Sequence, residues 1–239
     1  STQSRSSAAS DVYKRQLMRS AGCIVNDILD RKYDVLVKRT KNRPIASGKI
    51  SVKLSLLYVI ILCSLSFLIL IQFNLTTILL GLASMPFAFS YPLMKRFTYW
   101  PQLFLGFTFN YGLIMAWFSL NPEFNSIPLV FYIGAIFWTL AYDTIYGFQD
   151  IKDDEIIGVK STSIKFKKNP KIFIFVCYLI FILMQATAGI LMDFKYYYFI
   201  GLIVIAGQLL IYQIINLNTK NQKTCLEKFK SNNFLGFLV

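Results

Sequence analysis

Long apolar runs separated by short polar breaks recur along this chain. Most approach the roughly 20 residues that a helix needs to cross the hydrocarbon core of a bilayer. Six are clear: Leu54–Ile71, Leu75–Tyr91, Leu103–Leu120, Leu129–Tyr142, Ile172–Met192 and Tyr196–Leu217. Their length favours helices over buried strands, and the run from Leu129 reaches full length if it continues to Asp154. With Leu17–Val37 and Asn233–Val239, the pattern predicts an all-α, polytopic transmembrane bundle of eight helices, the first and last incomplete.

The composition agrees with a membrane protein, since 55% of the 239 residues are hydrophobic. A net charge of +13 would also suit a nucleic-acid partner, but the basic residues gather in alternate loops. That is the positive-inside pattern of membrane proteins, and it excludes the nucleic-acid interpretation. It places four basic loops on the cytoplasmic side, with these residues: Lys38, Arg39, Lys41, Arg43, Lys49 and Lys53; Lys95 and Arg96; Lys152, Lys160, Lys165, Lys167, Lys168 and Lys171; Lys220, Lys223, Lys228 and Lys230.

The first acidic cluster lies where Leu17–Val37 ends, and it comprises Asn26, Asp27, Asp30 and Asp34. On a helix these residues face one groove, and Arg19 shares that face about two turns earlier. Carboxylates near a bilayer are costly unless they are paired, solvated or bound to metal. A hard divalent cation such as Mg²⁺ takes oxygen ligands, often one or two carboxylates plus substrate phosphates. A solvated helix end with local ion pairs is the competing interpretation of this cluster alone.

A second acidic cluster follows Leu129–Tyr142 and contains Asp143, Asp150 and Asp154. If the helix continues, these residues fall close to one line, with Gly147 on the same stripe and Tyr146 beside it. Downstream, the segment 158–163 offers a lysine and hydroxyls that would suit phosphate contacts. Two matched acidic clusters favour one shared divalent-metal site over two solvated helix ends.

The other residues of the chain exclude several kinds of functional site. Histidine is absent, which excludes histidine ligation of metal and histidine general bases. The four cysteines are scattered and are typical of small buried hydrophobes: Cys23, Cys63, Cys177 and Cys225. Residues 1–16 are polar and serine-rich, and we interpret them as a non-native or disordered tail. Residues 17–239 then form a single transmembrane domain, which we expect to be truncated at both ends.

These motifs resemble those of a known family. The first cluster, with the downstream pairs Arg39-Thr40, Arg43-Pro44 and Ser47-Gly48, resembles the first signature of the UbiA-type intramembrane prenyltransferases. The run from Tyr142 to Asp154 looks like their second signature. Its continuation, Gly158-Val159-Lys160-Ser161-Thr162, is most similar to the 4-hydroxybenzoate polyprenyltransferases of ubiquinone synthesis. The resemblance covers the chain from Leu17 onward and implies a ring of helices, normally nine, around a central cavity.

The resemblance also implies a reaction, in which a polyprenyl group passes from its diphosphate to the ring carbon ortho to the hydroxyl of 4-hydroxybenzoate. It implies Mg²⁺ ligands at Asp27, Asp30, Asp34, Asp143, Asp150 and Asp154, of which Asp30, Asp143 and Asp150 are the expected catalytic residues. The expected substrate-binding residues are Arg19 for the benzoate carboxylate, Asn26 for the ring, Tyr146, and the cations Arg39, Arg43, Lys95, Arg96 and Lys160 for the diphosphate. The partners are the two substrates and the bilayer, and the location is a bacterial or mitochondrial inner membrane with a cytoplasmic active site.

Two alternatives stay open at this point. Another member of the same family, such as a haem-farnesylating, naphthoate or chlorophyll-type prenyltransferase, would keep the fold and the metal chemistry. An ion transporter would line a cation pathway with acids near the middle of the membrane. Here the acids cluster beside basic loops, and that position suits a diphosphate better than a permeating cation.

Overall fold

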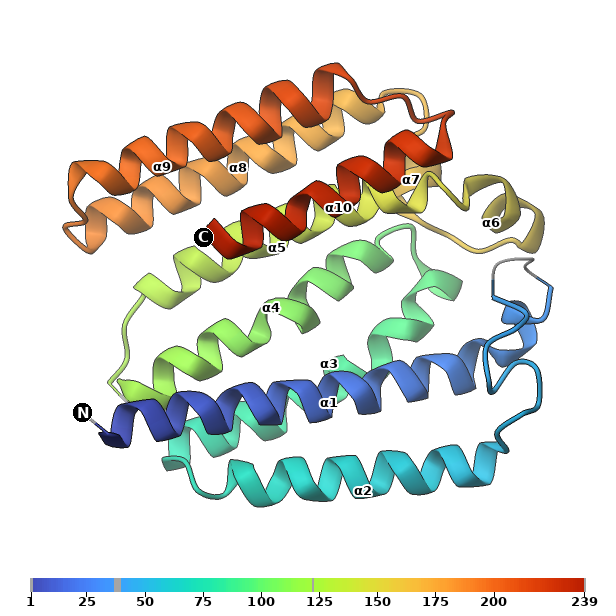
Figure 1. Ribbon diagram of the computed structural model, residues 1–239, viewed down its shortest axis with the longest axis horizontal. Coiled ribbons are helices and arrows are strands. Elements are labelled where there is room, and N and C mark those ends of the chain that lie inside the picture. Colours follow the sequence, from blue (N-terminus) through green and yellow to red (C-terminus); the bar gives the residue numbers. More distant parts are fainter. Residues whose placement is uncertain (1, 37–39, 122, 239) are drawn as a thin grey trace. The chain divides into compact units, whose positions relative to one another are not determined.

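The computed structural model describes residues 2–36, 40–121 and 123–238, and every regular element in those ranges is a helix (Figure 1). The prediction of an all-α fold is therefore confirmed. The chain forms two compact units. The first comprises residues 1–93 and 111–124, and the second comprises residues 94–110 and 125–239.

Six of the described helical segments are long and apolar enough to cross a membrane. Each of them overlaps one of the six apolar runs, as expected for a polytopic bundle. They are α2 (Val52–Leu70), α3 (Leu75–Phe97), α4 (Pro101–Leu120), α5 (Ile127–Gly147), α8 (Pro170–Leu191) and Tyr196–Gln213, which joins α9 (Tyr196–Ala206) to the π-helix η1 (Gly207–Gln213).

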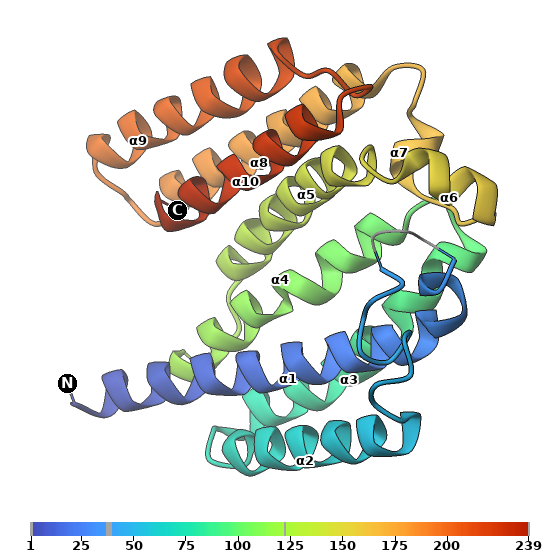
Figure 2. The ribbon, with the colours of Figure 1, turned by 45° about the vertical axis from the view of Figure 1, so that its right-hand side comes forward.

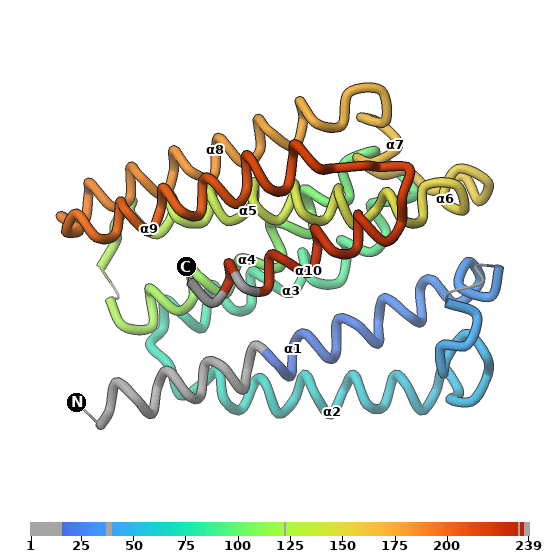
Figure 3. The backbone as a smooth tube through the Cα atoms, turned by 45° about the horizontal axis from the view of Figure 1, so that its top comes forward, coloured from blue at the N-terminus to red at the C-terminus, as the bar shows by residue number. Residues whose placement is uncertain are grey.

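In the first unit, α1 (Thr2–Asp34) packs along α2 (Figures 1 and 3). The buried face of α2 carries Ser55, Val59, Ser66 and Leu70, while most of its large aliphatic side chains point outward. Small residues inside and aliphatic residues outside are typical of helices that pack in lipid. α1 is helical from Thr2, so its backbone includes the segment interpreted as a tail, and that interpretation stays a prediction.

The second unit has its core between α5 and α8. A Cβ atom at Gly134 of α5 would lie 3.0 Å from the Cβ of Met184, so glycine allows the close approach of α8. The core is built from large side chains of both helices, all almost fully buried: Leu140, Ile145, Ile174, Tyr178 and Phe181. α10 (Gln222–Leu238) runs beside α5 (Figures 1 and 2).

A buried polar network joins η1 and α10 to the core of this unit. The hydroxyl of Tyr178 donates to Gln213 Oε1 at 2.5 Å, and the Gln213 amide donates to Asn232 Oδ1 at 3.2 Å. Gln208 and Gln213, five residues apart, both donate to Ser231 Oγ, because the wider π-helical turn places residues i and i+5 on one face. Satisfied buried polar groups of this kind fix one arrangement of the helices.

The predicted boundaries of the last helix were wrong. Instead of Asn233–Val239, α10 begins at Gln222, and Asn221 accepts a hydrogen bond from the Lys223 amide at 3.0 Å. The first half of α10 carries three lysines and a glutamate among apolar residues, so the sequence pattern indicated a basic loop. It is stabilised as a helix by Cys225 and Leu235, which are buried in the core of the second unit.

Candidate active site

The first acidic cluster lies on the last turns of α1. Asp27, Asp30 and Asp34 are separated by three and four residues, so one face of the helix carries all three, as the spacing predicts. Measured over the whole residue, Asp30 is 3% exposed and Asp34 is 7% exposed. Carboxylates buried to this degree are stable as anions only beside a cation or a set of hydrogen-bond donors. Their assignment as metal ligands stays a prediction.

Arg43 supplies a cation to this cluster. Its Nη1 atom donates to Asp27 Oδ1 at 2.8 Å and to Asp34 Oδ2 at 3.1 Å. The three side chains are partly buried, with 34% exposure for Arg43, 28% for Asp27 and 10% for Asp34. The role of Arg43 in binding diphosphate stays a prediction. In this structure Arg43 bridges two of the predicted metal ligands.

The loop after α1 fixes the position of Arg43. Thr40 donates its hydroxyl hydrogen to the Asp34 carbonyl oxygen at 3.0 Å, and the Arg43 amide donates to the Thr40 carbonyl at 2.9 Å. The Ser47 amide donates to the Arg43 carbonyl at 2.8 Å, and Gly48 follows with φ of +79°, a conformation that favours glycine. Arg39, predicted to contact phosphate, lies outside the described residues.

Electrostatics at the cluster favour a bound cation. α1 is not one of the six described helical segments that could cross a membrane, and Asp27 lies near the C-terminal end of α1. Burial raises the pKa of Asp27, the Arg43 guanidinium opposes this shift, and the neighbouring carboxylates Asp34 and Asp30 add to it. A single guanidinium therefore compensates three carboxylates only in part.

Two predicted substrate-binding residues lie on the same helix. Arg19 is exposed and Asn26 is half-buried, seven residues apart and so on one side of α1. Their roles toward a carboxylate and an aromatic ring stay predictions.

The second acidic cluster does not lie on one helix, so the prediction of a continuous stripe was wrong. α5 ends at Gly147, Asp150 occupies the N-cap position of α6 (Ile151–Ile157), and Asp154 lies on α6. The helix stops because residues 148–150 form a turn, in which the Phe148, Gln149 and Asp150 amides each bond a carbonyl three residues earlier. Asp143 therefore belongs to α5, while the two later aspartates lie beyond the turn.

The segment after α6 packs against the end of α5. A Cβ atom at Gly147 would clash with the Ser163 hydroxyl, which donates to the Thr144 carbonyl at 2.8 Å. The hydroxyls of Thr144 and Thr162 are hydrogen-bonded at 2.6 Å, and the Thr162 amide donates to Gln102 Oε1 at 3.0 Å. These hydrogen bonds hold α7 (Thr162–Lys165) against the end of α5.

The prediction that these hydroxyls contact phosphate is therefore not met in this structure. Ser161, Thr162 and Ser163 are at most 3% exposed. Thr162 and Ser163 bond α5, and Ser161 caps α7 by accepting from the Ile164 amide. Their observed contacts position the backbone around Asp143 and Gly147.

Three of the predicted diphosphate-binding cations come together in the second unit. The Lys160 amide donates to the Lys95 carbonyl at 2.8 Å, and the Lys160 Nζ atom donates to the Phe97 carbonyl at 3.2 Å. Lys95 and Arg96 form the basic last turn of α3. The segment 158–161 thereby brings Lys160 to the basic end of α3, which lies far from it in the sequence.

Sequence reasoning missed the contribution of α10. The ring of Phe229 lies 4.6 Å from that of Tyr146 and 5.8 Å from that of Tyr142, and Gln222 donates to the Gln149 carbonyl at 2.7 Å. These contacts flank Asp143 and reach the turn before Asp150. The sequence carried no signal for them, because aromatic residues in an apolar chain are most often ordinary core.

Among the described residues, no three carboxylate or cysteine side chains converge closely enough to hold a metal ion by themselves. The donors of both clusters are hard carboxylate oxygens. Such a set fits Mg²⁺, which is commonly bound by one or two carboxylates and completed by substrate phosphates and water.

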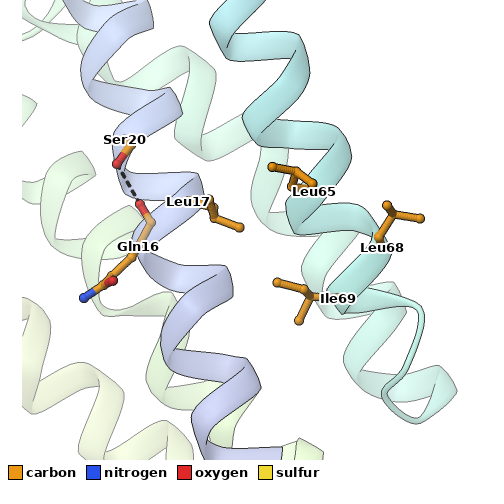
Figure 4. A pocket seen from close by; sticks show the side chains of 6 residues that line it. All are labelled: Gln16, Leu17, Ser20, Leu65, Leu68 and Ile69. Carbon is orange, nitrogen blue, oxygen red and sulfur yellow. Dashed lines mark hydrogen bonds between the residues drawn. The ribbon is translucent and has the colours of Figure 1, made fainter.

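The described surface also has a mostly apolar groove of about 500 Å³ between α1 and α2 (Figure 4). Leu17, Leu65, Leu68 and Ile69 line most of it, and the Ser20 hydroxyl donates to the Gln16 carbonyl at 2.9 Å. It has no acidic or basic lining residue. This groove therefore lacks the groups needed to bind a metal or a diphosphate.

Comparisons with known proteins give one consistent picture. The profile of the UbiA prenyltransferase family matches residues 12–238. A 4-hydroxybenzoate octaprenyltransferase of Psychromonas ingrahamii is 41% identical over 223 residues, covering 93% of this chain and 77% of that protein. A mitochondrial 4-hydroxybenzoate polyprenyltransferase of Drosophila pseudoobscura pseudoobscura is 40% identical over 226 residues, and there the chain spans 56% of the relative's length.

Solved structures agree on the fold. A UbiA homologue from Aeropyrum pernix K1, determined without ligand, superposes with a TM-score of 0.82 at 19% identity, covering 97% of this chain and 88% of the other. A UbiA homologue from Archaeoglobus fulgidus bound to GPP and Mg²⁺ superposes with a TM-score of 0.71 at 20% identity, covering 96% and 84%.

Proposed function

The chain belongs to the UbiA prenyltransferase family, and from this premise we propose that it prenylates 4-hydroxybenzoate in ubiquinone biosynthesis. The polyprenyl group comes from polyprenyl diphosphate and goes to the ring carbon ortho to the hydroxyl, with release of diphosphate. The observation that carries this proposal is the 41% identity, over 93% of this chain, to a 4-hydroxybenzoate octaprenyltransferase. The acidic and basic residues described above supply the chemistry that the reaction requires.

The first acidic cluster supports diphosphate chemistry by its donor set and its surroundings. Asp27, Asp30 and Asp34 would hold Mg²⁺ in the first cluster, and Asp143, Asp150 and Asp154 would hold it in the second. Mg²⁺, when bound, neutralises diphosphate oxygens and stabilises the charge that develops on the leaving group. The fit rests on carboxylate oxygens alone, since the chain has no histidine.

The basic residues bind the same leaving group. Arg43, Lys95, Arg96 and Lys160 donate to diphosphate oxygens, and Arg39 is assigned the same role from its motif. Cations aimed at oxygens that gain charge in the transition state lower its energy more than that of the bound substrate. The gathering of Lys160 with the basic end of α3 supports this role.

The reaction then needs a nucleophile and a route for one proton. The allylic carbon–oxygen bond breaks, and its electron pair leaves with the diphosphate. The ortho carbon of the ring bonds the allylic carbon, and the proton on that carbon passes to the released diphosphate, which restores aromaticity. Asp143 accepts a hydrogen bond from the phenol and so makes the ring more nucleophilic. Asp30 and Asp150 complete the set of catalytic carboxylates, and Tyr146 contacts the substrate.

The acceptor is held by α1. Arg19 binds the carboxylate of 4-hydroxybenzoate, because a guanidinium matches a carboxylate with two parallel hydrogen bonds. Asn26 lies two turns further along the helix and places the ring. Family membership and six apolar helices make the chain an integral membrane protein. We assign it to a bacterial or mitochondrial inner membrane, with the basic loops and the active site on the cytoplasmic side of a bacterial membrane.

The acceptor is tested in membranes that carry the chain. They are incubated with Mg²⁺, a polyprenyl diphosphate and one labelled acceptor at a time: 4-hydroxybenzoate, a dihydroxynaphthoate or homogentisate. The proposal predicts label in the lipid fraction from 4-hydroxybenzoate and at least tenfold less from the others, since a misplaced carboxylate or hydroxyl leaves polar groups unpaired. If another acceptor were labelled preferentially, 4-hydroxybenzoate would be refuted as the substrate, but the chain would still be a prenyltransferase. Aspartate variants that alter ion flux, with no labelled lipid, would support a transporter instead.

A further inference from the structure

We propose that Arg43 is an exchangeable counter-ion, which holds Asp27 and Asp34 in the metal-free protein and moves to the diphosphate when the metal–substrate complex binds. This inference rests on the proposed function and deepens it. It assigns Arg43 two successive partners, the carboxylates and then the leaving group.

Arg43 bridges two carboxylates, as a metal ion could do. One nitrogen, Nη1, contacts both carboxylates, at 2.8 Å to Asp27 and 3.1 Å to Asp34. These aspartates are seven residues apart on α1 and have no bond to one another, so Arg43 links them. A divalent ion would be held by the same carboxylates. Arg43 and a metal ion therefore compete for one position.

The degree of burial makes such an exchange possible. The Arg43 side chain is 34% exposed and that of Asp27 is 28% exposed. Water screens both charges of the Arg43–Asp27 pair and weakens it. The Asp34 side chain is 10% exposed, so it keeps Arg43 until another cation takes its place. A fully buried pair would cost several times more to separate. Arg43 can therefore leave its carboxylates once another cation replaces it.

The loop allows the side chain to move while the backbone stays fixed. The Arg43 amide and carbonyl are both hydrogen-bonded, to Thr40 and Ser47, and Ile45 and Ala46 next to it are buried. Motion is thus confined to the long side chain. A guanidinium has five donors in a planar fork, which suits diphosphate oxygens as well as carboxylates.

Charge balance sets the direction of the exchange. Asp27, Asp30 and Asp34 bring three acidic groups to one helix face, and Arg43 brings one positive charge. A divalent cation compensates this face better than a guanidinium does. Arg43 is then repelled by the ion and attracted by the diphosphate.

The test measures Mn²⁺ binding, because Mn²⁺ takes the same oxygen ligands as Mg²⁺ and its free form is counted by EPR. The full chain in lipid nanodiscs is titrated with Mn²⁺, first alone and then with inorganic diphosphate. Three variants are compared with the parent: Arg43→Gln, Arg43→Lys and, as a matched loss of one charge, Arg31→Gln. Arg31 is exposed on α1 and adjacent to Asp30, so it reports on general electrostatics.

Without diphosphate, Arg43→Gln should bind Mn²⁺ about threefold more tightly than the parent, since the competing cation is gone. Arg43→Lys should stay near the parent, and Arg31→Gln should change by less than about twofold, because its charge is screened by water. With diphosphate the order reverses, and Arg43→Gln should bind the Mn²⁺–diphosphate pair about tenfold more weakly.

Equal or weaker Mn²⁺ binding by Arg43→Gln without diphosphate would overturn the inference and leave Arg43 as a structural residue. An increase matched by Arg31→Gln would also overturn it, since the effect would then be general. Prenyl transfer by the parent chain is measured in parallel. If the parent chain forms product and either of these two results is obtained, only the exchange is refuted. If the parent chain forms no product from any acceptor, the proposed function is refuted.

Discussion

Phe229 of α10 lies against Tyr146 of α5, with the two ring centroids 4.6 Å apart and the ring planes tilted by 47°. Tyr146 stands between Asp143 and Asp150 in the sequence, so this contact ties α10 to the second acidic cluster. Asn232 extends the same connection along α5, where it accepts a hydrogen bond from the Trp138 indole, and Gln222 donates to the Gln149 carbonyl in the turn after α5. A polar helix that the sequence pattern did not reveal thus supports a predicted site.

Truncation of the Phe229 ring should loosen this support. Phe229→Leu removes the aromatic contacts with Tyr142 and Tyr146, which are worth about 1 kcal/mol beyond the buried area. We expect kcat for prenyl transfer to fall severalfold while Phe229→Tyr keeps most of it. The matched control is Phe194→Leu, which removes a similar ring contact with Tyr198, 4.8 Å away, on the connection between α8 and α9. If Phe194→Leu lowers kcat as much as Phe229→Leu, α10 has no specific role at the site.

A methyl group at Gly147 should force α5 and α7 apart. Gly147→Ala places a Cβ atom against the Ser163 hydroxyl, which is held by the Thr144 carbonyl. Overpacking and the loss of that hydrogen bond should together cost about 1–3 kcal/mol of unfolding free energy. Gly201→Ala on α9 is the control, since a Cβ atom there meets nothing within 4 Å.

A double-mutant cycle identifies the cause of that loss. Removing the Ser163 hydroxyl clears the space, so Gly147→Ala combined with Ser163→Ala should be less destabilised than the sum of the two single changes. The measurement is unfolding in detergent, followed by circular dichroism. Strict additivity would show that the two side chains do not compete for space.

The Tyr178 hydroxyl should contribute measurably to the buried network. Tyr178→Phe removes its hydrogen bond to Gln213 Oε1, which keeps a longer contact of 3.4 Å with the Asn232 amide. Since one acceptor bond survives, the expected loss of unfolding free energy is about 1 kcal/mol. Tyr132→Phe removes an exposed hydroxyl bond to the Phe107 carbonyl and should cost less. Equal losses would argue against a special role for the network.

The Cys225 thiol should react slowly with alkylating reagents. Burial raises its pKa to about 11, and only the thiolate is nucleophilic. At pH 8 its thiolate fraction is therefore about two orders of magnitude below that of an ordinary thiol, and the reaction should accelerate as the pH rises toward 11. Single-cysteine variants that retain Cys225 or the exposed Cys23 allow the two rates to be compared by mass spectrometry. Equal rates at pH 8 would contradict the burial of Cys225.

Much of the fold follows from the sequence, because run length alone distinguishes membrane helices. The six apolar runs all became helical spans, and the spacing of Asp27, Asp30 and Asp34 placed them on one helix face. These are local properties, which depend on helical periodicity and on the thickness of the bilayer.

The failures concern contacts between distant segments. Ser163 packs against Gly147 at the end of α5 from sixteen residues later, and the spacing of acidic residues carries no information about that contact. The helix from Gln222 is stabilised by burial of Cys225 and Leu235, although its own sequence is largely polar. The bridge from Arg43 to Asp27 needs the loop at Thr40 to fold back on α1, which is equally a tertiary effect.

The most direct test of the proposed function is the initial rate of 4-hydroxybenzoate prenylation as a function of Mg²⁺ concentration. It is compared between the parent chain, Asp30→Asn and Asp150→Asn, with EDTA as the metal-free point. Both changes are nearly isosteric, and asparagine is as favourable as aspartate at the N-cap position that Asp150 occupies, so folding should be retained. We predict no product in EDTA and a loss of about a hundredfold for each variant at saturating Mg²⁺. Full activity in EDTA, or in both variants, would contradict metal-dependent transfer by these two acidic clusters.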